Sequence, residues 1–296
     1  MDTQEILKRV RRIEIKTRGL SANVFAGSYH SAFKGRGMAF SEVREYQYGD
    51  DVRDIDWNVT ARFHHPYVKV FEEERELTLM LLVDVSGSLN FGTRGQLQRD
   101  MVTEIAATLA FSAIQNNDKV GMVFFSDRIE KYIPPKKGRK HILHLIREML
   151  DFQPSSTRTD LSVALQFLMQ VMKRRCSAFV LSDFVIPESN YTHPVIQMAG
   201  RRHDLMAIQV YDRWLAQLPE VGLVKVVDAE TGYEQYVDTG SSKLRRLYSR
   251  HWQESQSRLS EVMSKSRISK VSVSTEGDFV RALKEMFTLR QTKYVS

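Results

Sequence analysis

Residues 77–92, LTLMLLVDVSGSLNFG, begin as an apolar run and end in a polar cluster of one aspartate, two serines and two glycines. The apolar part has the length of a strand and is hydrophobic at nearly every position, which is typical of a strand covered on both faces. Strands of this kind lie in parallel sheets between layers of helices. The stretch therefore predicts an α/β fold in which polar residues follow a central strand.

Short apolar runs and segments of helical period alternate along the chain after residue 77. Further strands are predicted at 119–125, 176–183 and 204–212, with a short edge strand at 128–135 that Pro134 and Pro135 would end. Parallel strands need crossover connections, and these are almost always right-handed. The alternation thus predicts a doubly wound, mainly parallel sheet with helices on both faces.

The remainder of the chain divides into an N-terminal segment and additions to this α/β domain. Residues 1–75 are predicted to hold a helix at 4–17 and then extended or irregular structure. Within a domain spanning 76–296, two alternating runs at about 219–240 predict a β-hairpin excursion, with Gly232 at a turn position that requires positive φ. A helix at 242–264, a strand at 268–275 and a helix at 278–290 are expected to complete the domain.

The composition is that of a folded protein with a basic surface. Of 296 residues, 42% are hydrophobic and 27% charged, and the net charge is +7. A basic surface permits binding to nucleic acid or to an anionic membrane. The basic residues occur in small separate groups without an aromatic-rich motif, which is more typical of solvated helix faces.

The sequence also bears on the compartment. The single cysteine, Cys176, precedes a predicted strand and is expected to be a packing residue. Neither a signal-peptide core nor a run of about eighteen apolar residues is present, so no membrane span is predicted. We expect a cytoplasmic protein, and the sequence leaves open whether its basic N-terminal helix contacts a membrane surface.

The polar cluster is expected to belong to a cation site. In a parallel sheet, the carboxyl ends of the strands meet at one rim. This placement predicts that five oxygen-bearing side chains converge there from three loops: Asp84, Ser86, Ser88, Thr159 and Asp183. Carboxylate and hydroxyl oxygens suit Mg²⁺, or alternatively Mn²⁺ or Ca²⁺. Two carboxylates and three neutral hydroxyls form an incomplete cage, which leaves room for an acidic side chain of another molecule.

These residues resemble a known adhesion motif. DVSGS matches the D-x-S-x-S pattern of von Willebrand factor A domains, whose metal-ion-dependent adhesion site is completed by a threonine and an aspartate in later loops. Thr159 in TDLSVAL and Asp183 in LSD stand at the matching places. The resemblance implies that these five residues bind the metal.

A second resemblance concerns the N-terminal segment. Residues 35–62, GRGMAFSEVREYQYGDDVRDIDWNVTAR, are similar to the signature of the bacterial family called domain of unknown function 58. The resemblance extends over roughly residues 25–290 and implies an adaptor for a MoxR-type AAA+ ATPase, which would act on a client protein that presents an acidic side chain. Family members often carry N-terminal membrane spans, which this sequence lacks. The loop SSTRT has no glycines before its threonine, so Thr157 remains an alternative to Thr159.

Several alternatives stay open. Thr159 could be only a helix cap. The acidic run from Asp50 to Asp56 could be a second metal site, although its interleaved Arg53 and Trp57 favour a structural turn or a docking surface. A phosphohydrolase that used Asp84 as nucleophile would need a second aspartate where Ser86 stands, and a Ser86 nucleophile would need a histidine base. We therefore expect a metal-dependent interaction module, not an enzyme, with nucleic-acid or anionic-surface binding as the main rival.

Overall fold

The computed structural model describes residues 3–25, 38–73, 77–93, 96–185 and 194–295. The chain forms two compact units. The first combines Met1–Ala32 with Thr78–Ser296 and holds the α/β domain, and the second is Phe33–Leu77.

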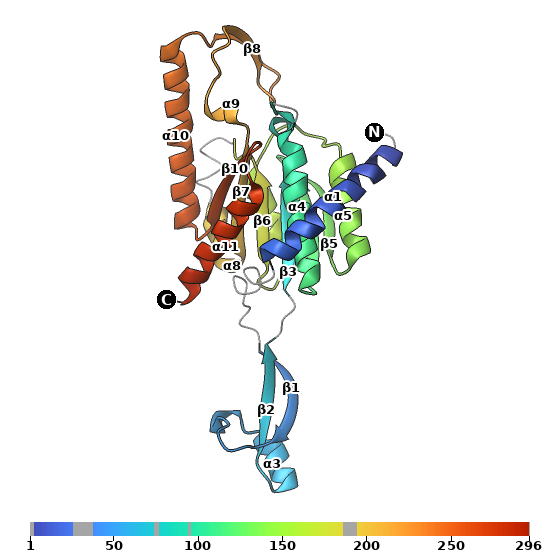
Figure 1. The fold of residues 1–296 in the computed structure, drawn as a ribbon. Helices are drawn as coiled ribbons and strands as arrows, with labels where there is room; N and C mark the ends of the chain where they lie inside the picture. The colour runs from blue at the N-terminus through green and yellow to red at the C-terminus, as the bar shows by residue number, and fades with distance from the viewer. Residues whose placement is uncertain (1–2, 26–37, 74–76, 94–95, 186–193, 296) are drawn as a thin grey trace. The chain divides into compact units, whose positions relative to one another are not determined.

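The α/β unit is built on a six-stranded sheet with the order β10-β7-β6-β3-β4-β5 (Figure 1). Its strands are parallel except for the last, which runs antiparallel to its neighbour. Their bounds are β3 Thr78–Asp84, β4 Lys119–Phe125, β5 Ile129–Lys136, β6 Ser177–Ser182, β7 Asp204–Tyr211 and β10 Ser269–Ser274. The predicted α/β fold with a mainly parallel sheet is confirmed.

Strand β3 lies inside the sheet, and its apolar sequence follows from that position. It pairs with β4 on one side and with β6 on the other, so that Val83 stands beside Phe124 and Leu181. Residues 79–83 are almost completely buried. A strand whose two faces are both covered by helices needs hydrophobic side chains on both faces, which explains the continuous apolar run.

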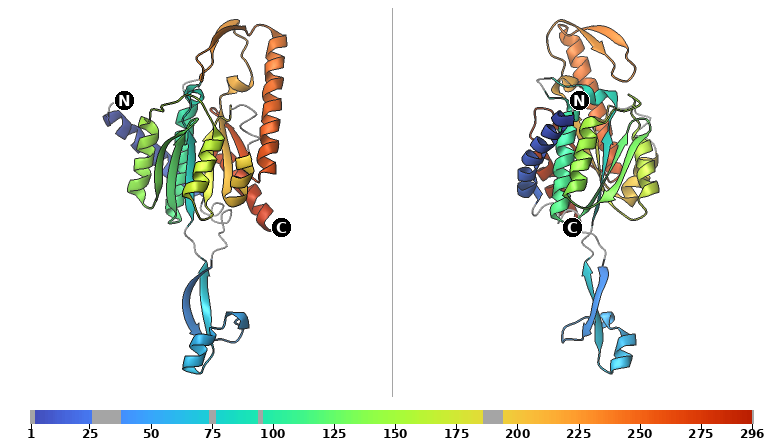
Figure 2. Two further views of the ribbon diagram at one scale, coloured as in Figure 1. Left: turned by 180° about the vertical axis from the view of Figure 1, so that it is seen from behind. Right: turned by 90° about the vertical axis from the view of Figure 1, so that its right-hand side faces the viewer.

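Helices cover both faces of the sheet (Figures 1 and 2). One face carries α1 Thr3–Phe25, α4 Gln98–Gln115, α5 Arg139–Asp151 and α11 Phe279–Val295. The other carries α6 Leu161–Val171, α8 Pro194–Arg202 and α10 Ser242–Lys265, whose apolar residues share one buried cluster with Met80, Leu82 and Val180 of the sheet. The segments of helical period that alternate with the predicted strands include α4, α5 and α6.

The edge strand β5 differs from the prediction at its end. It continues through Pro134 and Pro135 to Lys136. Its pairing with β4 shifts register between Val120 and Met122, next to these prolines. Proline is tolerated in an edge strand because its missing N–H need not face a neighbouring strand.

Helix α1 packs on the α/β unit. It lies against α4 and α5, and Arg9 pairs with Asp100 at 2.6 Å, Lys16 with Glu104 at 2.6 Å and Arg139 with Glu14 at 2.5 Å. The segment predicted as residues 1–75 is thus divided between two units, since α1 belongs to the α/β unit. None of the described helices has an apolar stretch long enough to cross a membrane.

The predicted hairpin is an antiparallel pair of β8 Leu223–Val227 and β9 Glu234–Asp238. Gly232 has a φ of 73°, in the left-handed region that its turn requires. The hairpin is followed by α10, which begins at Ser242 as expected, and Ser241 caps that helix by accepting a hydrogen bond from Leu244 N. A short helix, α9 Arg213–Ala216, precedes the hairpin.

The second unit is a two-stranded antiparallel sheet with short helical turns. It contains β1 Met38–Glu45, β2 Tyr67–Glu73, the 3₁₀ turn η1 Val52–Asp54 and the helix α3 Trp57–Phe63. Its acidic residues have structural partners: Asp50 pairs with Arg44 at 2.7 Å, Asp51 caps η1, and Asp56 caps α3. These contacts support the structural-turn interpretation of the run from Asp50 to Asp56.

Candidate functional site

The site begins where β3 leaves the sheet. Asp84 is the last residue of that strand, and its Oδ1 accepts a hydrogen bond from Ser86 N at 2.9 Å. The chain then turns through the 3₁₀ turn η2 Gly87–Asn90, which places the hydroxyls of Ser86 and Ser88 3.0 Å apart. The carboxylate of Asp84 therefore shapes the loop that presents both serines.

A residue that the sequence analysis missed positions Asp84. The Ser182 hydroxyl donates a hydrogen bond to Asp84 Oδ2 at 2.6 Å and accepts one from Phe184 N at 2.9 Å. Ser182 is the last residue of β6, which pairs with β3. Its position in LSD could have indicated a role, but the contact depends on strand pairing across 98 residues.

Asp183 follows Ser182 and is completely buried. Its Oδ1 accepts a hydrogen bond from Val185 N at 3.1 Å, and its main-chain carbonyl accepts one from Gln209 Nε2 at 2.8 Å. Its other carboxylate oxygen, Oδ2, is buried without a hydrogen-bond partner among the described residues. A buried carboxylate oxygen without a donor is expensive in free energy, and a cation is one way to compensate it.

The two aspartates influence each other. Burial raises the pKa of the Asp84 carboxyl, and the nearby charge of Asp183 raises it further. Burial also raises the pKa of Asp183, and the side chain of Ser88 opposes this shift. The hydroxyls of the motif loop, residues 84–90, lie beside these carboxylates. Two buried carboxylates at close range form a site that favours a bound positive charge.

Thr159 is buried in the loop that joins α5 to α6. It is not the helix cap: the N-cap of α6 is Asp160, whose carboxylate accepts a hydrogen bond from Ser162 N at 2.8 Å. The idea that Thr159 only caps the helix is therefore wrong. A neighbouring main-chain hydrogen bond, from Gly87 N to Thr157 O at 2.9 Å, connects the loop of Thr159 to the motif loop.

Thr157, the alternative to Thr159, has a different position. It is exposed, and its hydroxyl donates a hydrogen bond to the main-chain oxygen of Glu230 at 2.9 Å. Glu230 lies between β8 and β9, at the tip of the hairpin. The geometry therefore favours Thr159 over Thr157 as the threonine of the site, and it brings in a residue, Glu230, that the sequence analysis did not consider.

The five predicted side chains thus occupy one rim of the sheet, on three loops linked by hydrogen bonds. Their oxygen-only chemistry and the buried Oδ2 of Asp183 fit a hard divalent cation. No group of three or more His, Cys, Asp or Glu side chains within the described ranges has the spacing of a metal site. Any cation at this rim would accordingly depend on the serine and threonine hydroxyls as well as on the aspartates.

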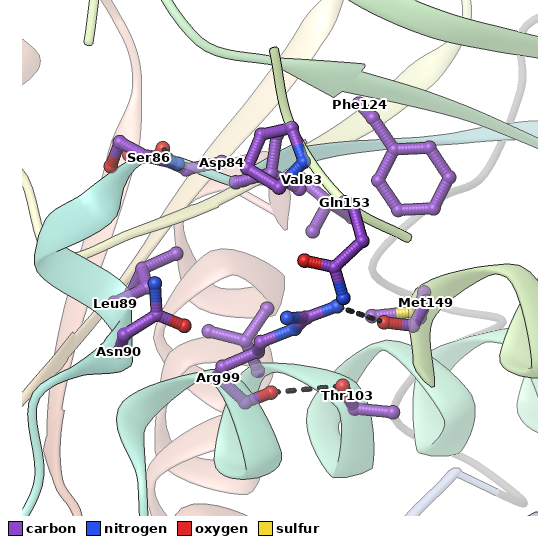
Figure 3. Close-up of a pocket in the computed structure, with 13 residues that line it drawn as sticks. Val83, Asp84, Ser86, Leu89, Asn90, Arg99, Thr103, Phe124, Met149 and Gln153 are labelled. Carbon is purple, nitrogen blue, oxygen red and sulfur yellow. Dashed lines mark hydrogen bonds between the residues drawn. The ribbon is translucent and has the colours of Figure 1, made fainter. Parts of the chain in front are cut away.

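A small pocket of about 190 Å³ lies behind the motif loop, between β3, β4 and α4 (Figure 3). Asp84 and Ser86 line one end of it, and the guanidinium of Arg99 reaches into it and donates hydrogen bonds to the carbonyls of Met149 and Phe152. The lining residues include no histidine. The pocket therefore offers Ser86 no imidazole base for nucleophilic chemistry.

Another buried aspartate, Asp212, stabilises the same rim. Asp212 follows β7 and accepts hydrogen bonds from Thr93 N at 2.8 Å, Trp214 N at 2.9 Å and the Thr275 hydroxyl at 3.2 Å. Burial would raise the pKa of Asp212, but these hydrogen bonds outweigh burial and lower the pKa. Its oxygens are satisfied by the protein, which distinguishes it from Asp183 and gives it a structural role.

Comparison with solved structures supports the fold. BatB from Bacteroides thetaiotaomicron superposes with a TM-score of 0.51 at 14% identity, over 73% of this chain and 99% of that one. An aerotolerance-related membrane protein from Bacteroides fragilis superposes with the same TM-score at 13% identity, over 73% and 99% of the two chains. The parallel sheet with DVSGS after an inner strand is a von Willebrand factor A-like fold.

Sequence comparison identifies the family. The uncharacterized protein Rv1480 of Mycobacterium tuberculosis is 34% identical over 234 residues, which is 78% of this chain and 73% of the relative. The family described as "Protein of unknown function DUF58" matches residues 42–258, which include most of the second unit, the motif loop and most of α10. This chain belongs to the DUF58 family.

Proposed function

We propose that this protein is a metal-dependent protein-interaction module that binds an acidic side chain of its partner. One observation carries the proposal: the buried Asp183 Oδ2 has no hydrogen-bond partner within the described residues and lies at the same rim as the paired hydroxyls of Ser86 and Ser88. A buried carboxylate is retained at such a position when a charge or a metal compensates it.

Asp84, Ser86, Ser88, Thr159 and Asp183 would hold the cation, directly or through water. Mg²⁺ is the expected ion, with Mn²⁺ or Ca²⁺ as alternatives, because all five donors are hard oxygens. A divalent ion held mainly by neutral hydroxyls keeps most of its positive charge and would attract an outside carboxylate. Ser182 supports the site by fixing Asp84, and the hydrogen bond from Ser86 N fixes the loop.

The partner we propose is a MoxR-type AAA+ ATPase together with a client protein that presents an acidic side chain. Membership of the DUF58 family supports this assignment, since the sequence resemblance to that family implies an adaptor for such ATPases. In this role the protein would assist the assembly or activation of client complexes. The proposed role is binding and not catalysis.

A capture experiment tests the function. The full chain is immobilised and offered the purified MoxR-type ATPase of the same organism, with Mg²⁺ or with a chelator in the wash. We expect retention only with Mg²⁺, and loss of retention for Asp84→Asn. The control is Asp151→Asn, which removes an exposed carboxylate at the end of α5 and should bind like wild type.

Salt dependence distinguishes this function from the alternative, which is binding of nucleic acid or of an anionic surface. Binding of nucleic acid or anionic lipid through the basic surface would fall steeply with salt and would not respond to the chelator. Binding through a cation at the rim would respond to the chelator and would be lost in Asp84→Asn. Turnover of a phosphoester that disappears in Asp84→Ala would contradict the non-catalytic role.

A further inference from the structure

The tip of the β8–β9 hairpin is an ordered turn with its own hydrogen bonds. The carboxylate of Asp228 accepts hydrogen bonds from the main-chain nitrogens of Glu230 and Thr231, each at 2.9 Å. The main chain closes the turn through a bond from Gly232 N to Asp228 O at 2.8 Å. Asp228 and Gly232 thereby fix the backbone of Glu230 independently of its side chain.

The tip is docked on the loops of the candidate cation site. The Thr157 hydroxyl donates to Glu230 O at 2.9 Å. On the motif loop, a Cβ added to Gly87 would lie 2.5 Å from Ala229 O and 3.3 Å from the Cβ of Thr157. Only a glycine at position 87 therefore lets the hairpin backbone approach this closely.

The Glu230 side chain turns inward from this docked backbone, toward the site. Its Oε1 is buried and has no hydrogen-bond partner in the described part of the chain. Burial raises the pKa of the Glu230 carboxyl, the side chain of Thr159 opposes that shift, and the charges of Asp228 and Asp183 add to it. The carboxylate thus lies close enough to Thr159 and Asp183 to interact with both.

The direction of the side chain is unexpected for a hairpin residue with access to solvent. Both strands of the hairpin are largely exposed, and Glu230 is half-buried at its tip. A carboxylate beside another buried carboxylate is repelled unless a cation compensates the two charges. The side chain has the chemistry that the incomplete set of donors requires, namely one additional anionic oxygen.

We propose that Glu230 is the chain's own ligand for the position that the five-residue site leaves open, so that the hairpin tip and a partner's acidic side chain compete for it. The inference rests on the proposed function. No three His, Cys, Asp or Glu side chains among the described residues are grouped at metal-ligand spacing; Glu230 would reach the cation by rotation of its side chain over a fixed backbone.

This arrangement makes partner binding conditional on displacement of the Glu230 carboxylate from the open position. A carboxylate on the same chain has a high effective concentration at the site. A partner's carboxylate must therefore bind strongly enough to displace it. Ligation by Glu230 and ligation by the partner's acidic side chain are then two alternative states of one protein, and each ligand favours the state that it binds better. A free acidic side chain in solution would therefore bind weakly, whereas a partner that makes further contacts beside the site would bind well.

The test uses Mn²⁺ alone as the probe, with the full chain. Mn²⁺ affinity and the water-proton relaxation of the bound ion are measured for wild type, Glu230→Gln and Glu234→Gln. The control residue Glu234 is on the same hairpin, at the start of β9, where it pairs with Lys225 at 2.6 Å. We expect Glu230→Gln to lower Mn²⁺ affinity about tenfold, because the ion loses a carboxylate ligand. The variant should also raise the relaxation enhancement of water protons, because a water molecule replaces that carboxylate on the ion. Glu234→Gln should match wild type in both measurements.

The outcomes separate the inference from the function on which it rests. Equal affinity and equal relaxation in wild type and Glu230→Gln, with binding weakened at least about tenfold in Asp84→Asn, would overturn the role of Glu230 and leave the cation site in place. Absence of Mn²⁺ binding in wild type would overturn both.

A second variant tests the docking without changing any carboxylate. Gly87→Ala would push the main chain at Ala229 away from the motif loop. Hydrogen exchange of residues 223–238 should slow when Mn²⁺ is added to wild type, and it should not slow in Gly87→Ala or Glu230→Gln. Equal slowing in all three proteins would contradict the proposal.

Discussion

Ser182 donates a hydrogen bond from its hydroxyl to Asp84 Oδ2 at 2.6 Å, and so joins the ends of two neighbouring strands inside the candidate site. Ser182→Ala should lower the free energy of unfolding by about 1–3 kcal/mol, because a buried carboxyl loses a hydrogen-bond partner. Urea unfolding measures this change. Ser177→Ala, at the other end of the same strand, is the matched control and should have a smaller effect.

The core of the fold could be predicted from the sequence because local patterns decide it. The apolar run 79–83 is buried on both faces, and the alternating runs around Gly232 form the hairpin. The end of β5 could not be predicted in the same way. Pro134 would end an interior strand, but β5 lies at the sheet edge, and only the three-dimensional strand order shows this.

Residues of the candidate site could be predicted from the sequence where a local motif or the end of a strand marks them. Asp84, Ser86 and Ser88 lie together in one recognisable motif, and Asp183 follows the end of β6. Thr159 lies between two helices, and the segment TDLSVAL marked it. Ser182 and Glu230 depend on contacts across many residues, which periodicity does not encode. The main signal for Glu230 is an acidic residue at a hairpin tip, and exposed tips with such residues are common.

The packing of the last helix depends on a buried ion pair between Arg290 and Asp204. The two side chains are 5% and 16% exposed. Arg290→Met should destabilise the protein by about 3–5 kcal/mol, because it leaves Asp204 without its partner in a desolvated position. Thermal or urea unfolding checks this value.

An exposed pair on the same helix provides the control for that prediction. Arg281 pairs with Glu285 at 2.9 Å, and both side chains are more than half exposed. Arg281→Met should cost about 0.3–0.5 kcal/mol, as is usual for exposed pairs of this spacing. Similar losses for Arg281→Met and Arg290→Met would contradict the role assigned to the buried pair.

The pH dependence of stability should reveal the stabilising contribution of the ionised Asp212 carboxylate. Its pKa is lowered below the ordinary value of 3.8 by the hydrogen bonds from Thr93, Trp214 and Thr275. A carboxyl whose pKa is lower in the folded state stabilises the protein fully above its unfolded pKa, and this contribution is lost as the pH falls through the folded pKa. The stability advantage of wild type over Asp212→Asn should therefore be constant from neutral pH down to about pH 5 and should shrink below pH 4. Urea unfolding at a series of pH values measures it, and a constant difference down to pH 2 would contradict the assignment.

Cys176 should be chemically inert in the folded protein. It is 4% exposed, and burial raises the pKa of its thiol to about 12. A thiol that is both buried and protonated reacts slowly with disulfide reagents. Labelling with an aromatic disulfide should be at least about 100-fold slower in native than in urea-unfolded protein. Rapid labelling of the native protein would show that the thiol is accessible, contrary to the structure.

The direct test of the account is the binding of Mg²⁺ to the purified full chain, measured by isothermal titration calorimetry for wild type, Asp84→Asn and Asp151→Asn. Wild type and Asp151→Asn should bind one ion per chain with equal affinity, and Asp84→Asn should bind at least about tenfold more weakly. Equal binding by all three proteins, or no binding by wild type, would contradict the claim that Asp84, Ser86, Ser88, Thr159 and Asp183 form a cation site.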